Sequence, residues 1–220
     1  MQMNEFKEPG RTVPRHRVIN PSVLYVGTPV ALITTLNADG SPNISPISSA
    51  WALGDRVVLG MATGGQGSEN AVRDGECVIN FPSASLWEQV ERLARTTGRH
   101  PVPDYKVAMG YHHEPRKFEA AGLTPLPSDI VRPPRIAECP LQFEARIVAA
   151  HAPGGGTWEI GCQHSFAIIE TRVERVHAHE DVTVEGTNHI DVSRWQPLLY
   201  VFRHYFGTSQ DLGQNFRAEI

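Results

Sequence analysis

Short runs of Val, Ile, Leu and Thr, each bounded by Gly, Pro, Asn or Asp, recur over residues 29–82. They predict strands at Val30 to Leu36, Arg56 to Met61 and Glu76 to Phe81, because β-branched residues favour extended backbone and the bounding residues end it. Asn37 to Gly40 is expected to form a hairpin turn after the first strand, since its Asp-Gly pair suits positive φ.

The next segment, Ser41 to Ala50, is extended but too poor in apolar side chains to be core. It is rich in hydroxyl and amide groups, from Ser41, Asn43, Ser45, Ser48 and Ser49. Because buried strands flank it, the pattern predicts a preformed polar wall for a ligand. The alternative is an ordinary solvent-exposed strand.

Helical spacing follows in three places. A Gly-rich loop and short helix are predicted over Thr63 to Arg73. Ser85 to Arg95 has its apolar residues on one face, with Ser83 or Ser85 as N-cap and Gly98 beyond its end. A third short helix is expected at Pro115 to Ala121, ended by Gly122.

Alternation returns in the second half of the chain. Leu141, Phe143, Ala145 and Ile147 would share the core face of a half-buried strand, with Gln142, Glu144 and Arg146 on the opposite face. After the flexible turn at His151 to Thr157, a second strand within Trp158 to Arg175 is expected to pair with the first as a hairpin.

Three segments lack such periodicity. Residues 1–22 are expected to form an N-terminal arm on the surface or against a neighbouring subunit, leaving 23–220 as one domain. Residues 99–135, rich in Pro and His, form a long irregular insert typical of a lid or subunit contact. The aromatic C-terminal segment from Ile190 on is expected to be docked, with Tyr200 and Phe202 in the core.

Six or seven strands without strand–helix alternation predict a mainly β, antiparallel barrel with one or two short helices. Nucleotide binding by a dinucleotide fold is excluded, because no GxGxxG motif follows a strand.

Composition narrows the function classes. The 220 residues carry a net charge of −4, and the 20 Lys and Arg residues are spread along the chain, which argues against nucleic-acid binding or a membrane-binding patch. The three cysteines are too widely spaced for a disulfide framework or a CxxC site. Without an apolar leader or a run of roughly 18 apolar residues, a soluble, cytoplasmic protein is expected.

Two further patterns contain residue types that can bind a metal or act as a nucleophile. His112-His113 and the pair His177 and His179 offer metal ligands, but no third ligand accompanies them in the sequence, so no metal is expected. Cys162 and His164 are adjacent, which is not how a Cys/His catalytic dyad is built.

An ordered series of motifs resembles the flavin reductase-like family of FMN-binding split barrels, which is related to flavoredoxin. The motifs are PVALITTLNADGSPNISPISSAW, GQGSEN, ECVINFPS, RKFEAAGLTP, RPPRIAECPLQFEARIV and SFAIIETRVERV, and they span roughly residues 25–180. Many members have Lys-Asp-Thr before the first helix, whereas this chain has Gly65-Gln66-Gly67, without the cation and the hydroxyl.

The resemblance implies a homodimer with FMN near the subunit interface. By motif position, the flavin contacts it implies are Asn43, Ser45, Pro46, Ile47, Ser48, Ser49, Met61, Ala62, Thr63 and Asn80, with Gln66, Gly67, Ser68 and Asn70 in the phosphate loop. Backbone N–H groups and a helix N-terminus can bind such a phosphate.

The reaction implied is hydride transfer from NADH or NADPH to flavin N5, with a partner oxygenase as one acceptor of the electrons. Arg116, Lys117 and His204 are candidate contacts for the nicotinamide nucleotide because they combine cations with ring groups in the insert and tail. No catalytic acid–base residue is assigned, since the cofactor carries the redox chemistry. The alternatives are an electron carrier that binds flavin without catalysis and a flavoenzyme acting directly on a small organic substrate.

Overall fold

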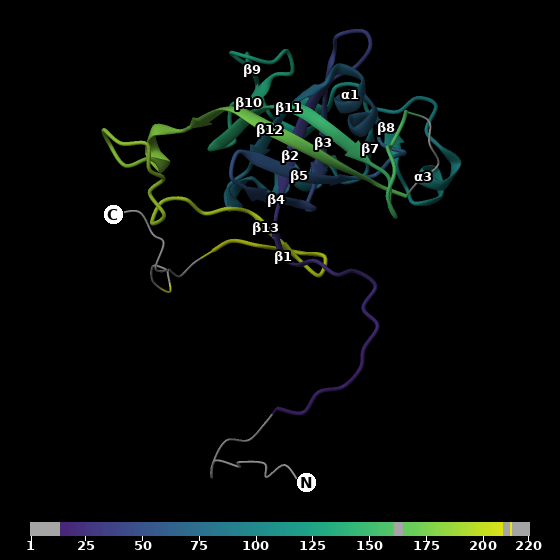
Figure 1. Cartoon of the computed structure of the whole chain (residues 1–220), viewed down its shortest axis with the longest axis horizontal. Helices are drawn as coiled ribbons and strands as arrows, with labels where there is room; N and C mark the ends of the chain where they lie inside the picture. Colours follow the sequence, from purple (N-terminus) through teal and green to yellow (C-terminus); the bar gives the residue numbers. More distant parts are fainter. Residues whose placement is uncertain (1–13, 161–164, 209–211, 213–220) are drawn as a thin grey trace.

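The computed structural model describes residues 14–160, 165–208 and 212, and its centre is a seven-stranded antiparallel sheet (Figure 1). In spatial order the strands are β3 (Pro42–Ile47), β2 (Ala31–Leu36), β6 (Glu76–Phe81), β11 (Leu141–His151), β12 (Ala167–Ala178), β5 (Arg56–Met61) and β4 (Ala50–Leu53). The sheet curls into a half-barrel with β3 and β4 at its two edges. The predicted antiparallel split-barrel class is confirmed.

Smaller elements surround this sheet. They are α1 (Gln66–Asp74), α2 (Trp87–Leu93), α3 (Asp104–Ala108) and α4 (Lys117–Ala121), the 3-10 turns Ala84–Leu86 and Glu180–Val182, a parallel pair of β7 (Thr96–Thr97) and β8 (His112–His113), an antiparallel pair of β9 (Pro125–Leu126) and β10 (Arg135–Ile136), and a three-stranded sheet of β1 (Val26–Pro29), β13 (Leu199–Val201) and β14 (His204–Phe206). The insert therefore contains a helix, α3, that the sequence pattern did not predict.

The strands and the turn predicted in the first half are confirmed, whereas the helix predicted at Ser85 to Arg95 is the 3-10 turn Ala84–Leu86 followed by α2, without a capping hydrogen bond from a serine side chain. Strands β5 and β6 have the expected bounds, and β2 begins one residue later than predicted, at Ala31. The β2–β3 turn is the expected one, with Gly40 at φ 82°. Strands β11 and β12 form the predicted hairpin. Two register irregularities interrupt it, between Glu144 and Ala145 and between Ile147 and Ala149.

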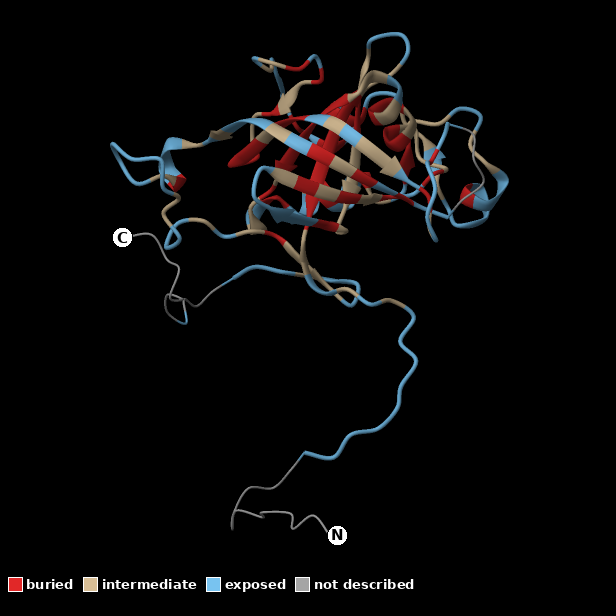
Figure 2. Cartoon of the chain, in the orientation of Figure 1, coloured by how far each residue is buried: buried red, intermediate tan, exposed pale blue. Residues whose placement is uncertain are grey.

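The core lies on both faces of β2 (Figure 2). One cluster contains Ile33 with Leu59 and Ile79, and the other contains Leu32 with Leu93 under α2 and α4. Because successive strand residues point to opposite faces, one strand feeds both clusters. The helices α2 and α4 thereby fix the position of the edge strand β3, on which they also pack.

The expected polar face of β11 is not exposed. Gln142 and Glu144 are buried, because the insert folds over this face of the strand. The Glu144 carboxylate accepts backbone N–H bonds from Asp129, Ile130 and Val131, and Gln142 donates to the carbonyl of Ile136. The alternation of apolar and polar residues therefore predicted the strand β11 correctly, but not the burial of its polar side chains.

The two ends of the chain differ from each other. Residues 14–22 are exposed and run away from the body of the protein (Figure 1), whereas residues 1–13 of the predicted arm lie outside the described residues. The C-terminal segment is docked through the β13–β14 hairpin. Phe202, however, is 44% exposed, so its assignment to the core is wrong. Phe202 and Arg203 form the hairpin turn, both at positive φ, and this turns the ring outward.

No helix in the described part of the chain is long and apolar enough to cross a membrane.

Candidate functional site

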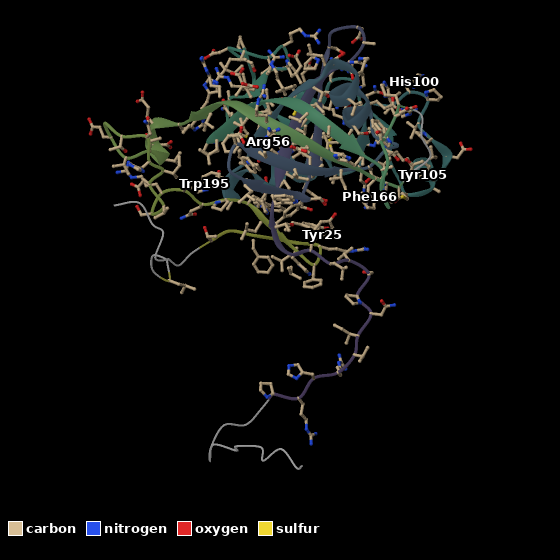
Figure 3. The ribbon with its side chains drawn as sticks, in the orientation of Figure 1. Tyr25, Arg56, His100, Tyr105, Phe166 and Trp195 are labelled. Atoms are coloured by element: carbon tan, nitrogen blue, oxygen red, sulfur yellow. The ribbon has the colours of Figure 1, made fainter. Side chains whose placement is uncertain are left out.

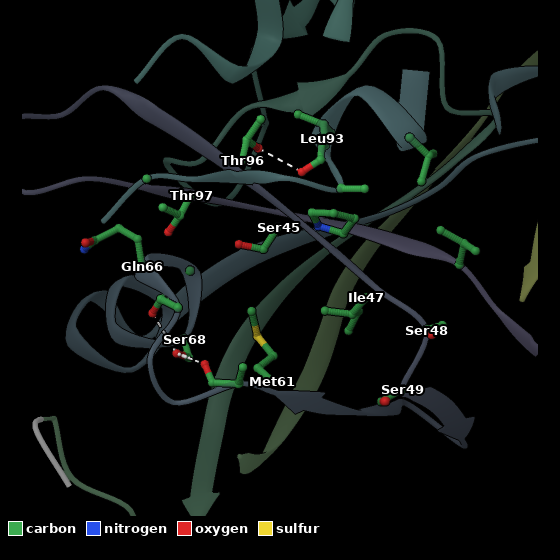
Figure 4. A pocket seen from close by; sticks show the side chains of 18 of the residues that line it. Ser45, Ile47, Ser48, Ser49, Met61, Gln66, Ser68, Leu93, Thr96 and Thr97 are labelled. Carbon is green, nitrogen blue, oxygen red and sulfur yellow. Dashed lines mark hydrogen bonds between the residues drawn. The ribbon is translucent and has the colours of Figure 1, made fainter. Parts of the chain in front are cut away.

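A cavity of about 430 Å³ lies beside the edge strand β3, between the amino end of α1 and the β13–β14 hairpin. Most of the residues that the family resemblance marks for flavin line it (Figure 4). These are Ser45, Pro46, Ile47, Ser48, Ser49, Met61, Ala62, Gln66, Gly67 and Ser68. The polar segment predicted as a ligand wall therefore faces a cavity rather than bulk solvent.

The amino end of α1 points its backbone into this cavity. Its N-cap is Gly65, and no side chain caps the helix. The first N–H groups of a helix have no intrahelical partner, so Gln66, Gly67 and Ser68 present donors where the cavity begins. This arrangement suits an anionic group.

The Ser68 hydroxyl has a role within the loop itself. The Ser68 hydroxyl donates a shared hydrogen bond to two carbonyl oxygens (Figure 4). They are those of Ala62, at 2.8 Å, and of Gly65, at 2.9 Å. The hydroxyl therefore holds the turn that aims the helix. Contact between Ser68 Oγ and a ligand stays a prediction, and it would require one of these bonds to be exchanged.

Close backbone approach shapes the same corner. A Cβ atom placed on Gly67 would lie 2.2 Å from Ser45 Oγ, and one on Gly98 would lie 2.5 Å from Asn43 Oδ1. The missing Cβ at both positions therefore leaves room for the Ser45 hydroxyl and the Asn43 amide to keep their orientations against α1 and the segment after β7.

Four of the marked residues do not line the cavity, namely Asn43, Thr63, Asn70 and Asn80. All four side chains are buried in the protein. Their assignment as flavin contacts stays a prediction.

The amides of Asn70 and Asn80 bond to protein groups. Asn80 Nδ2 donates to the Leu32 carbonyl at 2.9 Å, and Asn80 Oδ1 accepts the N–H of Ile136 at 2.9 Å. Asn70 Nδ2 donates to Asn37 Oδ1 at 2.9 Å and joins α1 to the end of β2. Asn43 Oδ1, by contrast, is a buried acceptor without a hydrogen-bond partner among the described residues.

An aromatic wall that sequence reasoning did not assign closes the other side of the cavity. Tyr25, Tyr200 and Tyr205 all line it. The Tyr25 and Tyr200 rings are 5.4 Å apart between centroids, and the Tyr200 and Tyr205 rings are 5.8 Å apart. The Tyr25 hydroxyl lies 2.9 Å from Ser49 Oγ, which ties this wall to the polar segment. In the sequence, the one indication of this aromatic wall is the aromatic content of the C-terminal segment.

Of the three candidate nicotinamide contacts, only Lys117 lines the cavity. Its Nζ donates to the carbonyl of Ile44 at 2.8 Å. Burial, together with the charge of Lys106 and against the opposing effect of Glu114, lowers the pKa of Lys117 to about 7. Arg116 is exposed and pairs with Glu119, and His204 is exposed on β14, so both lie outside the cavity.

Lys106 on α3 is a second lysine in the cavity wall, and no motif or spacing in the sequence marked it. Its side chain is buried, and its Nζ lies 5.7 Å from the centroid of the Tyr111 ring. Burial, and then the nearby Arg99, lowers the pKa of Lys106, while Glu69 acts in the opposite direction.

One group of metal-ligating side chains occurs within the described residues, formed by Asp129, Glu144 and His177. His177 Nε2 lies 2.6 Å from a Glu144 oxygen, and Asp129 pairs with Arg175 at 2.7 Å. Since the Glu144 oxygens also accept three backbone N–H bonds, this group ties the insert to the sheet. His179 instead contacts the carbonyl of Ala137. Cys162 and His164 lie outside the described residues.

Known structures share this fold. Flavoredoxin of Desulfovibrio vulgaris (Miyazaki F) superimposes with a TM-score of 0.72 at 18% identity, covering 93% of this chain and 99% of that one. Nitrilotriacetate monooxygenase component B from Bacillus cereus gives 0.70 at 19% identity, covering 92% and 100%. A structure from Shewanella frigidimarina, described with a split barrel domain, gives 0.64 at 18% identity, covering 86% of each chain.

The sequence comparisons agree with the structural ones. An uncharacterized protein of Bacillus subtilis, YdfE, is 45% identical over 205 residues, covering 93% of this chain and 95% of that protein. The model of the flavin reductase like domain matches residues 23–209. The chain therefore belongs to the flavin reductase like domain family.

Proposed function

We propose that the protein is an oxidoreductase that binds FMN in the cavity beside β3 and uses NADH or NADPH as hydride donor. The observation that carries this proposal is the convergence, in one cavity, of the polar segment Ser45 to Ser49 and the uncapped amino end of α1. Family membership supports a flavin-related redox function.

The cavity suits such a ligand in size and shape. Its volume of about 430 Å³ falls within the range of roughly 300 to 1,000 Å³ that is usual for cofactor sites. The missing Cβ of Gly67 lets the α1 backbone approach Ser45 closely, which leaves a cradle of N–H donors next to the hydroxyl-rich strand. FMN, when bound, would supply the hydride acceptor at N5.

The residues of the cavity would bind FMN and orient its ring system. Backbone N–H groups of Gln66 to Ser68 would hold the phosphate, and the segment Ser45 to Ser49 would hold the polar edge of the ring system. The tyrosine wall would exclude water and limit the ring's movement, because aromatic side chains pack well on flat ring systems. Lys117, at the side of β3, would donate to the Ile44 carbonyl of this strand and help to keep it in place beside the bound ligand.

We also propose that the protein is a homodimer. The register pairs Trp51 with Val58 and Ile168 with Gly60, so Trp51 and Ile168 lie on the same outer face of the sheet. The exposed apolar side chains of this face are Trp51, Leu53, Phe166 and Ile168, and Phe166 is visible at the lower rim in Figure 3. A second copy would cover this apolar surface. Gly60 also lines the cavity, so a dimer through this face would bring the partner close to the ligand.

The nicotinamide nucleotide is proposed to reach the flavin past the insert and the tail, where Arg116 and His204 lie exposed. The electrons would pass onward to a separate acceptor. An oxygenase is one candidate, because the similar Bacillus cereus structure is a monooxygenase component.

The deciding experiment is an absorption spectrum of the purified protein with FMN, recorded before and after anaerobic addition of NADH or NADPH. The proposal expects a bound-flavin spectrum that either nucleotide bleaches. Flavin that binds but is not bleached would favour an electron carrier or a flavoenzyme with its own organic substrate. Stopped-flow reduction of Arg116→Gln and His204→Gln would then show whether these residues affect the nucleotide's Michaelis constant rather than FMN affinity.

A further inference from the structure

The loop that presents the amino end of α1 to the cavity has little positive charge of its own. Between Ala62 and Asn70 the only charged residue is Glu69, and its carboxylate is already paired with Arg99. A helix terminus alone contributes roughly half an elementary charge. The backbone groups at this terminus would therefore leave most of the charge of a phosphate dianion bound there unbalanced.

Tyr105 on the short helix α3 reaches this loop at Gly64. A Cβ atom placed on Gly64 would lie 1.8 Å from the Tyr105 hydroxyl oxygen, so the missing side chain at residue 64 lets the tyrosine lie directly on this loop. Figure 3 shows Tyr105 at the same end of the molecule as His100. The ion pair of Arg99 with Glu69 fastens the start of the insert to α1 at the same place.

Lys106, the residue after Tyr105, is thereby brought into the cavity wall that also contains Gly65 to Ser68. The residue is 9% exposed, and its side chain has no hydrogen bond or ion pair to the described residues, whereas its backbone is hydrogen-bonded to Pro103 and Tyr111. The Tyr111 ring offers the ammonium group a weak electrostatic contact at 5.7 Å from its centroid. The aliphatic part of Lys106 is thus packed away from solvent, while its ammonium group meets the cavity without a carboxylate of the protein as hydrogen-bond partner.

The charges around Lys106 make its position more unfavourable in the absence of a ligand. Arg99 and Lys117 repel it, whereas the one carboxylate that attracts it, Glu69, is shared with Arg99. The protein as a whole is acidic, with a net charge of −4, so this local excess of cations is specific to the cavity. Groups held in an unfavourable electrostatic state are typical of binding sites.

We propose that Lys106 is the cation that binds the phosphate of the flavin nucleotide, together with the backbone N–H groups at the amino end of α1. This inference rests on the proposed function, because it assigns a residue to that same cavity. Lys106 thus replaces, from a helix in the insert, a charge that the loop before α1 lacks. It makes the insert part of the cofactor site and sets the preference for a phosphorylated flavin over riboflavin.

The test compares FMN with riboflavin, which has the same ring system and no phosphate. Affinities are measured by fluorescence titration of the flavin-free full-length protein for the native form and for Lys106→Gln. The matched control is Arg95→Gln, which removes an exposed cation at the start of the same region, outside the cavity. Lys106→Gln is expected to weaken FMN binding about tenfold or more, as loss of a charge-assisted hydrogen bond does, and to leave riboflavin binding within about threefold.

A charge-retaining variant covers the case in which the glutamine disturbs α3. Lys106→Arg is expected to keep a larger share of the FMN preference than Lys106→Gln, and circular dichroism of both variants reports on folding. Equal losses for FMN and riboflavin, or an unchanged FMN affinity, would overturn the assignment of Lys106 while leaving the flavin function intact. A native protein that binds neither flavin would overturn the proposed function itself, and the assignment with it.

Discussion

Lys117 Nζ lies 2.8 Å from the carbonyl oxygen of Ile44, on the edge strand that lines the cavity. This hydrogen bond satisfies one backbone acceptor. The residue is only 4% exposed, so its amine has lost almost all contact with solvent. Burial and Lys106 lower its pKa to about 7 from the ordinary value of 10.5. The arrangement disfavours the charged form in the folded protein.

The first prediction concerns the pH dependence that this causes. Between about pH 7 and 10.5 the unfolded chain binds the Lys117 proton more strongly than the folded chain does, so stability rises with pH over this window. Relative to Lys117→Met, the flavin-free native protein should gain about 2 kcal/mol of unfolding free energy between about pH 7 and pH 9. Urea unfolding at several pH values measures it. Parallel stability curves for the two proteins would show that the amine is not desolvated.

A second prediction tests the close contact of α1 with β3. Gly67→Ala adds a Cβ 2.2 Å from Ser45 Oγ, and overpacking of this kind destabilises by about 1 to 3 kcal/mol. The favourable helix propensity of alanine, about 1 kcal/mol, offsets part of this. The double variant Gly67→Ala with Ser45→Gly removes the clashing hydroxymethyl group. Denaturation of the native protein, the two single variants and the double variant should show a coupling of about 1 kcal/mol in unfolding free energy. If the two changes are strictly additive, the contact with Ser45 does not cause the destabilisation by Gly67→Ala.

Much of the fold could be predicted because β2, β5 and β6 contain strong local signals. Each combines β-branched residues with a turn residue at its end, and tertiary packing reinforces the same choice. The polar segment Ser41 to Ala50 was also predictable as a ligand wall, because no local structure explains so many hydroxyls between two buried strands.

Other features depend on contacts between segments distant in sequence. The alternation in β11 predicted an exposed Glu144, but the insert supplies backbone N–H groups that let a carboxylate be buried there. Lys106 had no periodic pattern around it, and its place in the cavity wall depends on the fold of the insert, including the contact of Tyr105 with Gly64. Asn80 was marked by its motif, yet its amide ties β6 to β2 and β10.

The third prediction concerns the buried carboxylate of Glu144. Burial raises its pKa, but hydrogen bonds from Asp129, Ile130, Val131 and His177 outweigh this, and the pKa is held below its ordinary value. Glu144→Gln should destabilise the protein by about 2 to 4 kcal/mol near neutral pH, because the amide hydrogens would face backbone donors.

The same pKa shift gives this effect a pH dependence. A carboxylate with a lowered folded pKa contributes stability above its unfolded pKa of about 4.5, and that stability is lost as the pH falls through the folded value. The difference between native protein and Glu144→Gln should therefore shrink in acid. Glu119→Gln, which removes one partner of an exposed ion pair with Arg116, serves as control and should change stability by less than about 1 kcal/mol. A constant difference at all pH values would refute the assignment.

The last prediction concerns the outer face of β4 and β12. Trp51 is 58% exposed and Leu53 is 74% exposed on the edge strand of the sheet, a position that soluble proteins rarely leave uncovered. If a second copy covers this face, Trp51→Glu should convert the dimer to a monomer of 24.3 kDa in light scattering at micromolar concentration. The matched control is Val192→Glu, which places the same charge at a residue that is 71% exposed in the loop before β13, and it should leave the dimer intact. Because Gly60 belongs both to this face and to the cavity, the monomeric variant should also bind FMN more weakly. A native protein that scatters as a monomer would reject the homodimer, and Trp51→Glu that stays dimeric would place the interface elsewhere on the surface.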